Sequence, residues 1–65
     1  MNEKAIALEK TRDELDAAVD HITSAFDMAH ANNLPNLADE ILTHKMYLLI
    51  LRKDVNAKYK AEVTQ

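Results

Sequence analysis

The chain has 65 residues and a mass of 7.4 kDa, with 8 Lys and Arg against 11 Asp and Glu and a net charge of -3. It contains no cysteine and no glycine, which excludes disulfides, cysteine zinc sites and glycine-rich phosphate loops. Chains of under roughly 70–80 residues usually need disulfides, a metal or a second subunit for stability, so self-association is expected.

The sequence carries no feature that predicts a membrane or export. Its longest apolar run, residues 46–51, is far shorter than the roughly 20 residues that span a bilayer. Residues 1–4 do not combine a basic region with a following apolar one, so no signal peptide is expected. We therefore expect a cytoplasmic protein without a membrane partner.

The first predicted helix covers about residues 3–31, with Asn2 as its N-terminal cap. Apolar residues recur along it in steps of three and four, which is the period of an amphipathic helix: Ala5, Leu8, Leu15, Val19, Ile22, Phe26 and Ala29. A column of small side chains flanks this stripe on one side: Ala7, Thr11, Ala18 and Ala25. A column of acids flanks it on the other side: Glu9, Asp13, Asp16, Asp20 and Asp27.

A loop is predicted at residues 32–35, because turn-forming residues cluster there. Asn32 or Asn33 can adopt the left-handed conformation that ends a helix where glycine is absent, and Leu34 can then fold back on Ala29. Pro35 suits a helix start, since its missing N–H would have no helical partner there. The cap expected for the second helix is Asn36, followed by two acids near the positive end of the helix dipole.

The second predicted helix covers about residues 36–62. Its main apolar stripe consists of Leu37, Ile41, Leu48, Val55 and Tyr59. A second stripe, at Leu42, Met46 and Leu49, lies beside the first. At residues 46–51 apolar side chains almost surround the helix, which indicates burial on more than one side.

A loop this short makes the two helices antiparallel neighbours, so the predicted fold is an all-α antiparallel helical hairpin. The register sets Phe26 opposite Ile41 and brings Arg52 within reach of Asp16. A two-helix hairpin has no interior, and its second stripe would stay exposed in a monomer. We therefore expect dimerisation into a four-helix bundle. The pattern is similar to that of small plasmid- and phage-type helical-hairpin dimers, a similarity of fold pattern alone.

Catalysis and cofactor binding are not expected from these residues. There is no cysteine nucleophile, serine and threonine are few, and a small bundle has little room for a pocket. The best metal candidate pairs Asp27 with His30 and Glu40 with His44, but it lacks the repeated Glu-x-x-His of bundle di-iron sites. We therefore predict no metal and no cofactor, with His30 a partner of the helix dipole.

The favoured function is that of a non-enzymatic regulatory or interaction protein, which homodimerises and binds a larger protein through helix faces, with inhibition as one outcome. The predicted dimer and protein-binding residues are Ala18, Ala25, Leu42, Met46, Tyr47, Leu49 and Ile50. The column of acids is the predicted docking face for a basic partner. Such a column is more often a solvated face, but its members repel one another at helical spacing, which favours a basic partner.

Two alternatives involve nucleic acid. The basic end of the second helix, with Arg52, Lys53, Lys58 and Lys60, could bind RNA or DNA directly. This is not favoured, because an acidic chain lacks the counterion release that supplies most such affinity. In the other alternative, the acids imitate a row of phosphates and inhibit a nucleic-acid-binding protein.

Overall fold

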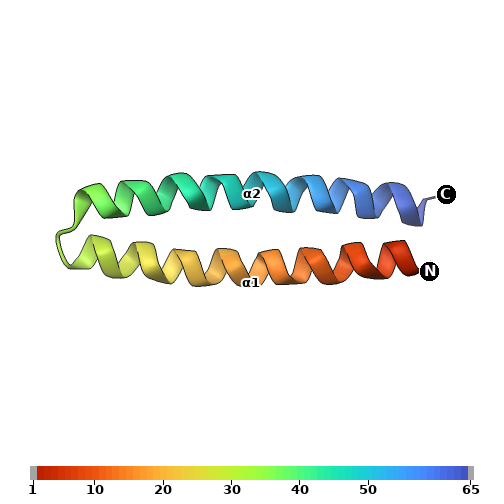
Figure 1. Cartoon of the computed structure of the whole chain (residues 1–65), viewed down its shortest axis with the longest axis horizontal. Helices are drawn as coiled ribbons and strands as arrows, with labels where there is room; N and C mark the ends of the chain where they lie inside the picture. Colours follow the sequence, from red (N-terminus) through yellow and green to blue (C-terminus); the bar gives the residue numbers. More distant parts are fainter. Residues whose placement is uncertain (1, 65) are drawn as a thin grey trace.

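The computed structural model describes residues 2–64 as two antiparallel helices (Figure 1). Helix α1 spans Glu3–Ala31 and helix α2 spans Pro35–Val63, each with 29 residues. Both termini lie at one end of the hairpin and the loop lies at the other (Figure 1). The predicted all-α hairpin is confirmed, and α2 begins at Pro35, a residue expected in the loop.

The N-terminus of α1 is held by a side-chain cap. Asn2 has an extended backbone, and its Oδ1 accepts a hydrogen bond of 2.7 Å from the backbone N–H of Ala5. This bond satisfies one of the N–H groups that lack a partner in the first turn, and it stabilises a helix by about 1 kcal/mol. The cap predicted at Asn2 is therefore confirmed.

The loop closes α1 in a Schellman motif built on asparagine. Asn33 has a φ of 57°, the left-handed conformation that glycine usually supplies. The backbone N–H of Leu34 donates to the carbonyl of Ala29 at 3.0 Å, and that of Asn33 donates to His30 at 3.3 Å. These two bonds satisfy carbonyls at the end of α1 and turn the chain back toward α2.

The start of α2 differs from the predicted one. The N-cap position is Leu34 and makes no side-chain cap bond, so the prediction that Asn36 caps this helix is wrong. Pro35 takes the first helical position, because its fixed φ already suits a helix. The cap therefore falls on Leu34, whose carbonyl accepts the first helical hydrogen bond from Ala38 at 2.9 Å.

The helices meet along one line of contact. Its buried residues are Ala5, Val19, Ala29 and Ala38, and within residues 2–64 no large side chain is fully buried. Leu37, expected in the main stripe, is 48% exposed, while its neighbour Ala38 is buried instead. Alternating steps of three and four residues give an average repeat of 3.5, whereas a straight helix has 3.6 residues per turn. The predicted stripe therefore rotates slowly away from the line of contact and departs from it near the helix ends.

The molecule is a rod, with extents of 49 × 14 × 11 Å and a radius of gyration of 14.9 Å. Neither helix has, in its described residues, a stretch long and apolar enough to cross a membrane.

Candidate functional site

The hairpin has two unlike sides. Because α2 runs opposite to α1, each flank of α1 lies on the same side of the hairpin as one particular flank of α2. A rotation of 100° per residue around each helix shows to which side each residue belongs. We call one side the apolar side; it carries Thr11, Ala18, Ala25, Leu37, His44, Tyr47 and Leu51. The other is the charged side; it carries the column of acids on α1 and Leu49, Arg52, Lys53 and Asn56 on α2.

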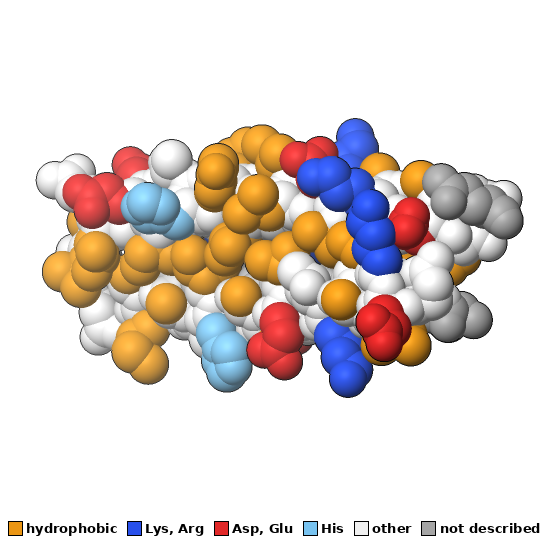
Figure 2. All heavy atoms as spheres, turned by 45° about the vertical axis from the view of Figure 1, so that its right-hand side comes forward, with side chains coloured by type: hydrophobic (Ala, Val, Ile, Leu, Met, Phe, Trp, Pro, Cys, Tyr) orange, Lys and Arg blue, Asp and Glu red, His pale blue; other side chains and the backbone are white. Residues whose placement is uncertain are grey.

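The apolar side presents a continuous band of hydrophobic side chains along the junction of the helices (Figure 2). Near the loop the band widens into an open hollow, lined by Ala25, Met28, Ala29, Asn32, Leu34, Leu37 and Ile41. Farther along α2, Tyr47 is 62% exposed. The predicted residues Ala18, Ala25 and Tyr47 therefore lie together on this side, on both helices.

The charged side holds the polar contacts that join α1 to α2. Arg12 Nη1 donates a hydrogen bond of 3.2 Å to Asn56 Oδ1, and the guanidinium lies 5.0 Å from the centre of the Tyr59 ring. Arg52 Nη1 donates to Asp16 Oδ1 at 3.2 Å, as the predicted register required. Both arginines stand where the apolar stripes are interrupted, and their contacts bind the helices in one register.

The predicted acidic docking face is only partly free. Glu9 and Asp16 are half-buried, whereas Asp13, Asp20 and Asp27 are exposed. Asp16 is paired with Arg52, and Asp13 lies 3.8 Å from Arg12. Positive charge from Arg52 on α2 and from Arg12 on α1 thus offsets part of the repulsion within the column.

Four predicted binding residues of α2 lie away from the apolar side. Leu49 lines an open pocket on the charged side, together with Arg12, Asp16, Arg52, Lys53 and Asn56. Met46 and Ile50 lie on the edge of α2 that faces away from α1, and Leu42, one turn earlier, lies where that edge meets the charged side; we call the three residues the outer edge. They are 40%, 59% and 59% exposed, respectively. The predicted set therefore occupies three surfaces of the hairpin.

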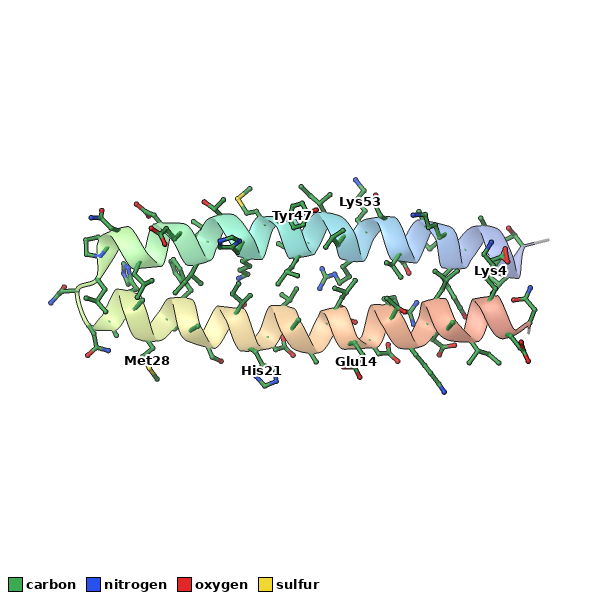
Figure 3. All side chains as sticks on the ribbon, in the orientation of Figure 1. Lys4, Glu14, His21, Met28, Tyr47 and Lys53 are labelled. Atoms are coloured by element: carbon green, nitrogen blue, oxygen red, sulfur yellow. The ribbon has the colours of Figure 1, made fainter. Side chains whose placement is uncertain are left out.

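The outward edge of α1 is mostly polar by comparison. Met28, His21 and Glu14 project from it, away from α2 (Figure 3). Met28 is 70% exposed and adjoins the hollow near the loop. Met28 belongs to none of the stripes or columns predicted for residues 3–31, and its exposed side chain lines one border of the hollow.

The candidate metal-binding and basic residues are spread over the described part of the hairpin. In the part of the chain that the structure describes, no group of three His, Asp or Glu side chains could hold a metal ion. His30 stacks on Phe26, with ring centres 5.9 Å apart. The basic end of α2 is split, since helical rotation puts Lys53 and Lys60 on the charged side and Lys58 on the apolar side.

Comparison with known proteins assigns no role to these surfaces. The chain matches no protein-family model, and no curated protein or solved structure matches it significantly.

Proposed function

We propose that this chain is a small non-enzymatic interaction protein of the cytoplasm, which works as a homodimer and binds a larger protein through the helix faces that the dimer leaves uncovered. One observation carries the proposal. The hairpin exposes 4979 Å² of surface, whereas a compact monomer of its mass would expose about 4,200 Å². The surplus is about 800 Å², which is what one partner contributes to an interface of standard size.

The surplus follows from the architecture. Two helices share one line of contact, so each buries a narrow stripe and leaves its other apolar residues in water. Nine large apolar residues within residues 2–64 are at least 40% exposed, including Tyr47 at 62% and Met46 at 59%. A second hairpin packed against the first would create the interior that a single hairpin lacks, in a four-helix bundle.

The partner site is assigned to the outer edge, at Leu42, Met46 and Ile50. These residues are spaced four apart on α2 and form one apolar ridge. Methionine is flexible and polarisable and adapts to the shape of a partner, so the ridge suits the groove of a larger protein. A protein bound in this way acts by occupying a surface, and inhibition follows where that surface is needed by another ligand.

The dimer is tested by measuring mass with light scattering over a dilution series and following the melting temperature at each concentration. We expect twice the monomer mass at high concentration and a melting temperature that rises with concentration, because association stabilises the folded state by mass action. A monomer at every concentration, with a constant melting temperature, would contradict the proposal.

The partner site is tested with a photo-crosslinking amino acid at Met46 of the full chain, expressed in the source cells. The matched control carries the same group at Lys10, an exposed position on α1. We expect a discrete adduct larger than the dimer from position 46 and not from position 10. Equal yields from the two positions would contradict the assignment of the outer edge.

A further inference from the structure

We propose that a second copy of the chain covers the apolar side, with each helix antiparallel to its own counterpart and the two loops at opposite ends of the bundle. This inference rests on the proposed function, since it specifies the interface of the proposed dimer. It draws on the continuous apolar band of Figure 2, on the surplus surface of about 800 Å², and on the order of charges along α2.

Two columns of α2, each with a spacing of seven residues, border the apolar side. The inner column consists of Leu37, His44, Leu51 and Lys58. The outer column consists of Glu40, Tyr47, Asp54 and Ala61. Such columns are the helix surfaces that meet in antiparallel four-helix bundles.

A two-fold axis at right angles to α2, level with its midpoint at Leu49, reverses the order of residues in the second copy. Every member of the inner column then meets a member of the outer column. The apolar pairs are Leu37 with Ala61 and Tyr47 with Leu51. Glu40 meets Lys58, which has the opposite charge, and His44 meets Asp54, a hydrogen-bonding partner. Apolar residues meet apolar residues, and acids meet bases, along the whole length of α2.

The same axis suits α1. The bond between Arg52 and Asp16 fixes the level of the two helices, and it sets Leu49 level with Val19, so Ala18 lies within one residue of the axis. Ala18 of one copy therefore meets Ala18 of the other, and Ala25 meets Thr11. Small side chains at these contacts let the two copies of α1 approach closely while the larger residues of α2 fill the space beside them.

The two hairpins can also cover each other over their full length in a second arrangement. In it the two loops lie at the same end, and α1 of one copy packs on α2 of the other. Residues that are level within one hairpin would then meet across the interface, which brings Glu14 against Asp54. It would also separate Glu40 from Lys58. Like charges disfavour this arrangement, and the order of charges therefore selects antiparallel counterparts.

The arrangement is tested by cysteine cross-linking, because the chain has no cysteine of its own. In the proposed dimer, Ala18→Cys places the thiols of the two copies next to each other, one on either side of the axis. If both loops lay at one end, the two thiols would be on diagonally opposed helices and out of reach of each other. Asp20→Cys is the control, at an exposed position of nearly the same level on the charged side. Under mild oxidation we expect a disulfide-linked dimer from Ala18→Cys and little from Asp20→Cys. Equal yields from the two variants would overturn the inference.

A charge exchange gives an independent test. The two-fold axis makes the contact between Glu40 of one copy and Lys58 of the other occur twice. Glu40→Lys and Lys58→Glu each turn both contacts into pairs of like charges, and each is expected to raise the dissociation constant about tenfold. The double variant is expected to restore it to within about twofold. Glu40 and Lys58 lie about 27 Å apart within one α2, at 1.5 Å per residue, so restoration requires contact between copies.

The two proposals fail in different ways. A chain that stays monomeric at all concentrations overturns the proposed dimer together with its interface. A concentration-dependent dimer in which Ala18→Cys does not cross-link, or in which the double variant is as weak as the single ones, overturns only the antiparallel pairing of counterpart helices.

Discussion

The two sides of the hairpin carry different kinds of side chain between the same two helices. On the charged side, Arg12 bonds to Asn56 and Arg52 bonds to Asp16, so polar contacts tie α1 to α2. On the apolar side, Leu37 is 48% exposed where it lines the hollow near the loop, and Tyr47, farther along α2, is 62% exposed. One side therefore fixes the register within a hairpin, and we expect the other to govern association between hairpins.

The largest effect is expected from Tyr47→Glu, compared with Met46→Glu. The two residues are neighbours with exposures of 62% and 59%, so in a single hairpin the two changes should be equally mild. In the proposed dimer only Tyr47 is covered, and a carboxylate there should weaken association about 100-fold, as loss of a buried tyrosine anchor does. Light scattering over a dilution series measures the difference, and equal dissociation constants would remove the distinction between the apolar side and the outer edge.

A smaller effect is expected on the charged side from Arg12→Ala. This change removes the hydrogen bond to Asn56 and the contact with Tyr59, and it should lower the free energy of unfolding by about 1–2 kcal/mol. Urea denaturation measures it. The control is Lys10→Ala, an exposed neighbour, which should change stability by less than about 0.5 kcal/mol.

The pair of Arg52 and Asp16 should contribute less than Arg12. Their side chains are 41% and 50% exposed, so solvent screens the attraction. A double-mutant cycle with Arg52→Ala and Asp16→Ala should give a coupling of about 0.2–1 kcal/mol in unfolding free energy, falling as salt is added. A larger coupling that is insensitive to salt would show that association buries this pair, contrary to an interface on the apolar side.

The smallest effect is expected from Asp20→Asn. Asp20 lies one turn from Asp16, so removing its charge relieves a like-charge pair and should stabilise the hairpin by about 0.2–0.5 kcal/mol. Glu14→Gln is the contrasting change, because Glu14 lies one turn from Lys10 and should lose a favourable pair of similar size. Thermal melting at low salt compares the two, and equal shifts of the same sign would contradict the effect assigned to the column of acids.

Local sequence features predicted most of the backbone. Asn2 and Asn33 occupy the ends of α1 as expected, because capping and left-handed conformations depend on single side chains. The start of α2 was missed, since Pro35 and Asn36 both favour a helix start and only one can take the first position. Two of the predicted binding residues, Ala18 and Leu49, are half-buried and the other five are exposed, and their division among three surfaces was not predicted.

The sequence by itself determined two helices, their turn and their register, because apolar periodicity and turn residues act over a few positions each. The tertiary structure decided which flanks of α1 and α2 share a side. That pairing depends on the line of contact common to both helices and on their opposite directions, and neither belongs to one helix alone. It put Ala18 with Tyr47 on the apolar side and left Met46 on the outer edge, although Met46 and Tyr47 are adjacent in the chain, since neighbouring helical residues point 100° apart.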